Sequence, residues 1–193
     1  MSLNTFGSVL VLIAFGFYIF DVLFREVKPN RVTWAMLTLN GAVLLFSYRE
    51  QMATDGMTGA VLLITMYTLG PAIIFLLALW KGEGDIKRRD LLCGGGSLFF
   101  LILWQVTDIP GIAIWGSILV DFFALLPILL GVIEGEKESL TAWSISQLGD
   151  IVSLIALDQW TVMSAAYPVY VAIWNAILIA YIVRNTRRGY RAR

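Results

Sequence analysis

The sequence predicts an all-α integral membrane protein with seven transmembrane helices. Three observations lead to this prediction: the composition, the length of the apolar runs and the placement of Lys and Arg. Of the 193 residues, 59% are hydrophobic and only 15% are charged. Soluble domains carry about 25% charged residues. The composition is therefore typical of a membrane protein.

The apolar runs are long enough for helices that cross a bilayer. A spanning helix needs about 20 mostly apolar residues, and continuous runs favour helices over a barrel, whose strands would alternate. No basic residue precedes the first run, so we expect a retained helix instead of a signal peptide. The second and sixth runs are shorter and carry polar residues. The seven runs cover 6–24, 32–48, 57–80, 90–106, 111–133, 140–157 and 164–183.

The basic residues lie in alternate loops. With seven spans, Arg49 is the one basic residue on the side of the N-terminus, and the other 13 of the 14 Lys and Arg residues lie on the opposite side. Loops rich in Lys and Arg stay in the cytoplasm. We therefore expect a multi-pass protein of the inner (plasma) membrane, with its N-terminus outside and its C-terminus cytoplasmic.

Two polar phrases between apolar runs belong to an internal repeat. The phrase KPNRVTW at 28–34 and the phrase KESLTAW at 137–143 align at an offset of 109 residues. At the same offset FGSVLV at 6–11 aligns with WGSILV at 115–120, and residues 6–48 give ten identities without a gap. Each copy holds three apolar runs, and the run at 90–106 lies between the copies.

The repeat predicts a 3+1+3 parallel-repeat plan. The unpaired fourth helix starts the second copy in the orientation of the first, so the copies are related by an axis along the membrane normal. Parallel repeats of this kind are one transporter design, with the substrate site between the repeats. The expected parts are a first three-helix repeat (1–81), a linker helix (82–110), a second repeat (111–184) and a basic cytoplasmic tail (185–193).

This plan resembles the SWEET and PQ-loop (MtN3-like) transporter superfamily, and the resemblance covers nearly the whole chain. It implies that the protein is a divergent bacterial member. Pro29 sits where those carriers have a proline-bearing hinge. Pro127 resembles the proline that bends their fifth helix, and Trp174-Asn175 resembles residues that line their sugar pockets. The resemblance implies hinges at Pro29 and Pro127 and a sugar or similar metabolite as the substrate. Vitamin carriers with a similar plan remain an alternative.

Polar residues inside the apolar runs are the candidate site, because polar groups in a bilayer usually face a cavity or a partner. Gln147 and Asp150 share one face of the sixth run with Trp143, and the seventh run adds the rings of Tyr167, Tyr170 and Trp174. Aromatic faces with amides and carboxylates suit a polar organic solute. The alternative is hydrogen bonding that only ties helices together. The predicted substrate-binding residues are Asn40, Tyr67, Gln147, Asp150, Tyr170, Trp174 and Asn175.

Other residues carry more specific expectations. Asp121 and Asp150 are the candidates for proton coupling, since a carboxylate buried without Lys or Arg favours its protonated form. Trp34 and Trp143 lie near cytoplasmic helix ends, where we expect them to be interfacial anchors. Asp21 precedes Arg25 by four residues, which predicts a local ion pair.

The residue inventory narrows the function. Histidine is absent and there is one cysteine, so we expect no disulfide within the chain, no metal, no cofactor and no enzymatic activity. A net charge of zero gives no reason to expect nucleic acid as a partner.

The predicted partners are the lipid bilayer and a small solute, with a homo-oligomer left open. The predicted function is a carrier for a small polar organic solute by alternating access between two three-helix bundles, with proton coupling left open. A non-transporting membrane scaffold or assembly factor is the alternative.

Overall fold

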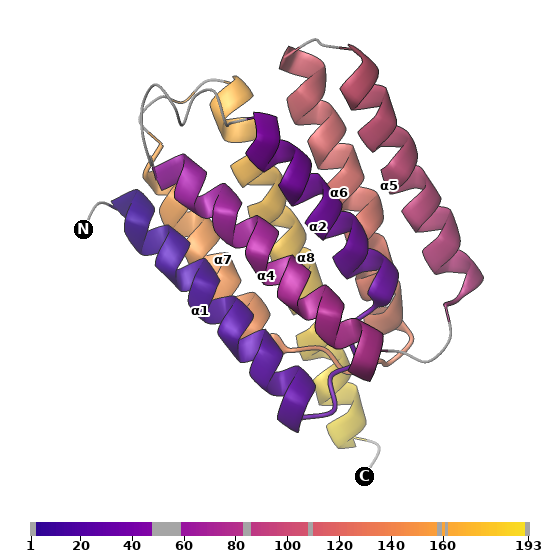
Figure 1. Cartoon of the computed structure of the whole chain (residues 1–193). Coiled ribbons are helices and arrows are strands. Elements are labelled where there is room, and N and C mark those ends of the chain that lie inside the picture. Colours follow the sequence, from indigo (N-terminus) through magenta and orange to yellow (C-terminus); the bar gives the residue numbers. More distant parts are fainter. Residues whose placement is uncertain are drawn as a thin grey trace.

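The regular structure is helical throughout the part of the chain that the computed structural model describes (Figure 1), which comprises residues 3–47, 59–82, 86–107, 110–157, 160 and 162–191. The predicted all-α class is therefore confirmed. The helices are α1 (Leu3–Phe24), α2 (Arg31–Ser47), α4 (Gly59–Lys81), α5 (Arg88–Thr107), α6 (Pro110–Ile133), α7 (Leu140–Ile155) and α8 (Val162–Arg191).

The helices have the length and the surface of a membrane protein. Among the described residues, three stretches are long and apolar enough to cross a bilayer: Thr5–Phe24, Trp115–Ile133 and Ala165–Arg187. The stretches Thr65–Lys81 and Leu140–Ile155 are apolar but shorter. Large apolar side chains also point outward, and on α4 they follow one face of the helix, at Leu69, Ile73, Leu76 and Trp80. A surface of this kind fits contact with lipid better than contact with water.

The two repeated polar phrases begin helices in the same way. The Asn30 side-chain oxygen accepts a hydrogen bond from the Thr33 backbone N–H at 3.1 Å, just before α2. The Ser139 hydroxyl accepts one from the Ala142 backbone N–H at 3.2 Å and caps α7. Asn and Ser are among the preferred N-cap residues. Asn30 and Ser139 are 109 residues apart, so the repeat places both caps at matching positions.

The three helices that precede α5 in the chain pack in the same order as the three that follow it. Helix α4 packs against both α1 and α2, and α8 packs against both α6 and α7. Between these two groups, α1 packs along α7 and α2 packs along α6. Helix α5 packs on α6 and α2, beside the other six helices (Figure 1). The six helices other than α5 therefore form a closed ring of neighbours.

Glycines allow α1 and α7 to approach closely. A Cβ atom added at Gly149 would lie 3.0 Å from the carbonyl oxygen of Gly7 and 2.9 Å from a methyl group of Val11. A Cβ atom added at Gly7 would in turn lie 3.1 Å from the carbonyl oxygen of Gly149. Small residues at such crossings let helix backbones pack tightly in membranes.

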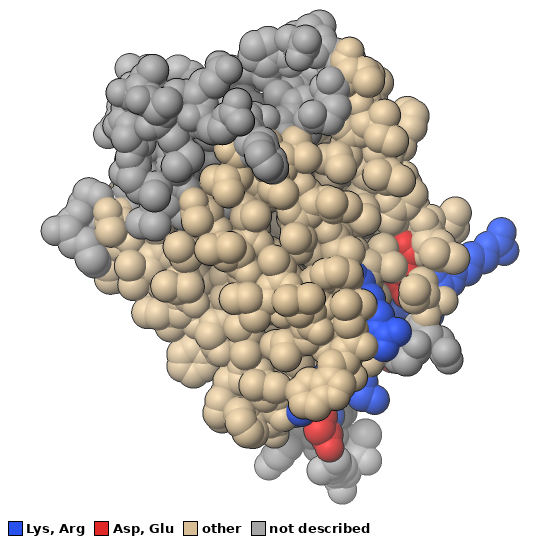
Figure 2. Space-filling view, viewed as in Figure 1, with Lys and Arg blue, Asp and Glu red and all other residues tan. Residues whose placement is uncertain are grey.

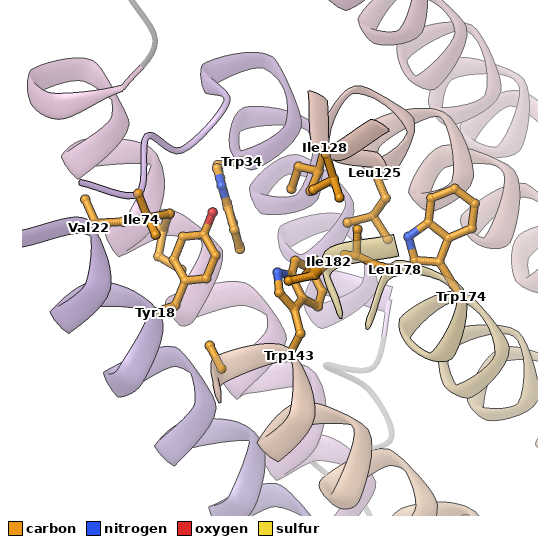
Figure 3. Packing of buried hydrophobic residues seen from close by; sticks show 13 residues of the cluster. Tyr18, Val22, Trp34, Ile74, Leu125, Ile128, Trp143, Trp174, Leu178 and Ile182 are labelled. Carbon is orange, nitrogen blue, oxygen red and sulfur yellow. The ribbon is translucent and has the colours of Figure 1, made fainter. Parts of the chain in front are cut away.

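Trp34 and Trp143 lie in the core, and the prediction that they are interfacial anchors is wrong. They are only 2% and 8% exposed. Figure 3 shows both indoles near Tyr18, whose ring centroid is 4.8 Å from that of Trp34 and 6.4 Å from that of Trp143. The two side chains turn toward the contact between helices, where they gain more buried area than at the lipid surface.

Among the described residues, the charged side chains at the surface gather at one end of the molecule, toward the lower right of Figure 2. We call this the charged end; there α1, α4 and α6 end and α2, α5 and α7 begin. Arg25 pairs with Asp21 at 3.5 Å, as predicted. Lys87 and Arg89 pair with Glu134 and Glu136, which ties the start of α5 to the segment after α6. Arg49 lies outside the described residues.

Candidate functional site

A buried carboxylate on α6 is held by side chains from two other helices. Asp121 is 5% exposed. The Asn40 amide on α2 donates to its Oδ1 atom at 2.7 Å, and the Tyr167 hydroxyl on α8 donates to its Oδ2 atom. The same Asn40 amide also donates to the Ser117 hydroxyl at 3.2 Å. Asp121 thus joins α2, α6 and α8.

A second buried carboxylate, on α7, is held in the same manner. Asp150 is 5% exposed. The Tyr67 hydroxyl on α4 donates to its Oδ1 atom at 2.6 Å, and the Asn175 amide on α8 donates to its Oδ2 atom at 2.7 Å. Asp150 thus joins α4, α7 and α8.

The two sets share one chemical pattern. Each carboxylate accepts from one amide and one phenol, and in each case one donor precedes α5 in the chain and the other follows it. Tyr67 lies close enough to both carboxylates to interact electrostatically with each, so the two sets are neighbours. We call them together the carboxylate network; its members are Asn40, Tyr67, Ser117, Asp121, Asp150, Tyr167 and Asn175.

A row of aromatic rings runs beside the network. Tyr167, Tyr170 and Trp174 follow one face of α8, with ring centroids 6.2 Å and 6.4 Å apart along the row. Trp174 then meets the edge of Phe122, the residue after Asp121, at 5.3 Å. The row therefore begins at Asp121, to which the Tyr167 hydroxyl donates, and continues along α8 to Trp174 in the hydrophobic core.

Several buried polar atoms in this region have no hydrogen-bond partner among the described residues. They include the indole N–H of Trp174, the hydroxyl of Tyr170 and the side-chain oxygen of Gln147. Most buried polar atoms in proteins have a partner, either within the protein or in bound water. Bound water or a polar ligand in this region would supply the missing donors and acceptors.

At the charged end, α1 is connected to the start of α7 by contacts that we call the latch, made by Asp21, Glu26, Lys137, Glu138 and Ser139. The Ser139 hydroxyl donates to Asp21, and Lys137 pairs with Glu26 at 2.8 Å. The adjacent cavity, about 630 Å³ in volume, is lined by residues of both repeated phrases, Lys28 and Lys137 among them.

Glu138 is the unusual acid of the latch. Its carboxylate accepts hydrogen bonds from the Trp143 indole N–H at 3.1 Å and from the Ser139 backbone N–H at 3.2 Å. Burial raises the pKa of Glu138 to about 7, although hydrogen bonds from Trp143, Ser139 and Tyr18 act in the opposite direction. Lys137, by contrast, holds the pKa of Glu26 below its ordinary value.

The structure brings most of the predicted site residues into one region. Asn40, Tyr67, Asp121, Asp150 and Asn175 all belong to the carboxylate network. Tyr170 and Trp174 lie in the row of rings, and Gln147 lies on α7 one turn before Asp150. Their roles in binding and in proton coupling remain predictions.

The two predicted hinge prolines are both fully buried. Pro29 lies in the connection between α1 and α2, and Pro127 lies within α6. Their hinge roles also remain predictions.

Two members of the network did not emerge from the sequence. Tyr167 was expected only to add a ring to the site, whereas its hydroxyl donates to Asp121. Ser117 was overlooked. The sequence held a clue for Ser117, which precedes Asp121 by four residues on the same helix face.

No protein-family model matches the chain, and neither the curated proteins nor the solved structures gave a match. The site is therefore interpreted from its own chemistry.

Proposed function

We propose that this protein is a membrane carrier for a small polar organic solute and works by alternating access between two three-helix bundles. The observation that carries the proposal is the carboxylate network. It concentrates buried carboxylates, amides and phenols within apolar helices, where such groups are costly unless they serve a partner or a pathway. Each carboxylate takes one donor from either side of α5, so a movement between the bundles would change its hydrogen bonds.

The proposed architecture is seven spans in the 3+1+3 plan, with α5 as the linker helix. The placement of α4 between α1 and α2, and of α8 between α6 and α7, supports it. The matching caps at Asn30 and Ser139 support it too. The concentration of Lys and Arg at the charged end favours that end as the cytoplasmic one. We also propose kinship with the SWEET and PQ-loop carriers, on the basis of Pro29, Pro127 and this packing order.

In the proposed mechanism the described conformation is closed at the cytoplasmic end. The latch contacts Asp21–Ser139 and Glu26–Lys137 hold α1 and α7 together there. Solute would enter from the opposite end, lie against the rings of α8 and exchange hydrogen bonds with the network. Opening of the latch would then release it to the cytoplasm. Asp121 and Asp150 are the candidates to carry a proton in the same cycle.

The test is uptake by the purified protein in sealed lipid vesicles, with a panel of sugars, amino acids, nucleosides and vitamins, with and without an inward proton gradient. We expect saturable uptake of at least one class, and at least a tenfold loss in Asn175→Ala, since an amide hydrogen bond contributes roughly 1.4 kcal/mol or more to such a site. Proton coupling predicts that Asp150→Asn removes the effect of the gradient.

One result would remove proton coupling from the proposal, and another would overturn the carrier function. Equal accumulation with and without the gradient rules out coupling and leaves the carrier intact. Absence of uptake for every class, together with a specific protein that co-purifies in stoichiometric amount, supports the membrane scaffold instead.

A further inference from the structure

We propose that the transported solute is an organic cation, specifically an ammonium compound that also carries an oxygen acceptor. This inference rests on the proposed carrier function and adds the class of solute. It is drawn from the charge of the carboxylate network, from the absence of a basic partner and from the orphaned donors beside the network.

The first step concerns the charge of the two carboxylates. Hydrogen bonds donated to a carboxylate favour its ionised form. Tyr67 donates to Asp150 at 2.6 Å, and Asn40 and Asn175 donate to their carboxylates at 2.7 Å. Each carboxylate is thus surrounded by donors in the manner of an anion. All four donors are neutral, so they orient the carboxylates but do not neutralise the negative charge.

The second step concerns the missing countercharge. No described ion pair includes Asp121 or Asp150; the described pairs lie at the charged end. No Lys or Arg occurs in the sequence between Arg31 and Arg49, between Arg89 and Lys137 or between Lys137 and Arg184, and these stretches include both carboxylates. A buried carboxylate without a countercharge is strongly disfavoured. The network is therefore suited to a cation that comes from outside the protein.

The third step concerns the kind of cation. Aromatic faces attract organic ammonium ions, and the row of Tyr167, Tyr170 and Trp174 starts at Asp121, to which the Tyr167 hydroxyl donates. Among the described residues no group of three acidic or cysteine side chains is placed to hold a metal ion. The surroundings favour an organic ammonium ion over a divalent metal.

The fourth step concerns the orphaned donor. Trp174 is only 6% exposed, and its indole N–H has no partner among the described residues. Its ring packs against that of Phe122, the residue after Asp121, and it directly precedes Asn175, which donates to Asp150. An N–H donor requires an acceptor, so the solute should carry a hydroxyl or carboxylate oxygen together with its ammonium group.

The experiment is thermal unfolding of the purified full-length protein with choline, and in parallel with 3,3-dimethyl-1-butanol, the neutral carbon analogue of choline. Putrescine, L-lysine, sodium chloride and D-glucose complete the panel. We expect a rise in the unfolding midpoint of about 2–4 °C with at least one oxygen-bearing ammonium compound. We expect no rise with the neutral analogue, and none in Asp121→Asn or Asp150→Asn. The matched control is Asp21→Asn, a buried aspartate of the latch, which should keep the response.

Several results overturn the inference. A response that is as large with the neutral analogue, or that survives in both network variants, shows that charge is not recognised. Stabilisation by sodium chloride alone assigns the network to an inorganic ion. A complete lack of response to the ammonium compounds contradicts it as well. If D-glucose or another neutral solute is then taken up by vesicles, the carrier function stands and the solute class proposed here fails.

Discussion

At the scale of single residues, the network combines neutral hydrogen-bond donors with two carboxylate acceptors. The Tyr67 side chain shows both parts of a donor's contribution. Its hydroxyl binds Asp150 at 2.6 Å, and its ring meets the edge of Phe15 at 6.0 Å. Replacing the hydroxyl alone therefore separates hydrogen bonding from packing.

We predict that Tyr67→Phe lowers the free energy of unfolding by about 1 kcal/mol, which is the usual range for a hydrogen bond between membrane helices. The initial uptake rate should also fall under conditions in which the variant stays folded, because Asp150 loses its orientation. The measurements are denaturant unfolding in detergent and initial uptake rates. Tyr181→Phe is the control, since the described contacts of Tyr181 involve its ring beside Arg184. Equal effects of the two substitutions would contradict the role of the Tyr67 hydroxyl.

Glu138 leads to a prediction about pH. Its folded-state pKa is raised from the ordinary 4.5 to about 7, mainly by burial. The folded state therefore holds a proton that the unfolded state releases. This contribution to stability is fully present below about pH 4.5 and is lost as the pH rises through about 7.

We expect Glu138→Gln, which keeps an oxygen for the Trp143 indole, to flatten the decline in unfolding midpoint between pH 5 and pH 7.5. The other charged groups of the latch are Asp21, which binds the neighbouring Ser139, and the Glu26–Lys137 pair. Glu136 is the acid that acts on Glu138 electrostatically, so Glu136→Gln is the comparison that isolates the effect. Unfolding curves measured across this range test the prediction. An unchanged slope in Glu138→Gln would show that the carboxylate is ionised throughout.

At the scale of helices, the tight crossing of α1 and α7 depends on glycine. A Cβ atom at Gly149 would lie within 3.0 Å of backbone oxygen on α1, whereas a Cβ atom at Gly16, also on α1, meets nothing within 4 Å. We predict that Gly149→Ala destabilises the protein by about 1–3 kcal/mol through overpacking. Gly16→Ala should stabilise it by about 0.5–1 kcal/mol through helix propensity. The signs are measured by unfolding of the two variants under one condition. Stabilisation by both substitutions would show that the crossing tolerates the added Cβ atom and that helix propensity alone decides.

The helices also show what the sequence could predict. Apolar runs give α1, α6 and α8 directly, because a membrane helix satisfies its own backbone and its length is set by the bilayer. The caps at Asn30 and Ser139 follow from local chemistry in the repeated phrases.

Contacts between helices were harder to predict. Trp34 was misassigned because sequence position near a helix end does not say which way a side chain turns. Tyr167 and Ser117 were missed as partners because their contacts join residues 46 and 77 positions apart along the chain. The positions of Asp121 and Asp150 within apolar runs identified them as candidates. Their hydrogen-bond donors come from other helices and could be identified only from the packed structure.

At the scale of the whole molecule, the latch and the network share helix α7. Helix α1 packs along α7, which carries Asp150, and the cap of α7 is joined to Asp21 at the end of α1. The carrier proposal requires these helix ends to separate once in every cycle, whereas a static scaffold does not.

A reversible cross-link distinguishes these cases. In a protein with Asp21→Cys and Ser139→Cys, whose native side chains are in hydrogen-bonding contact, oxidation should join α1 to the start of α7. We expect uptake into vesicles to fall by at least tenfold on oxidation and to return on reduction, while binding of solute to the network persists. The single variant Asp21→Cys should be insensitive to oxidant, since the native Cys93 is buried. Disulfide formation is followed by counting free thiols. If the fully oxidised protein transports at the rate of the reduced one, the cytoplasmic ends of α1 and α7 do not separate during transport, and the two bundles do not alternate about the network as proposed.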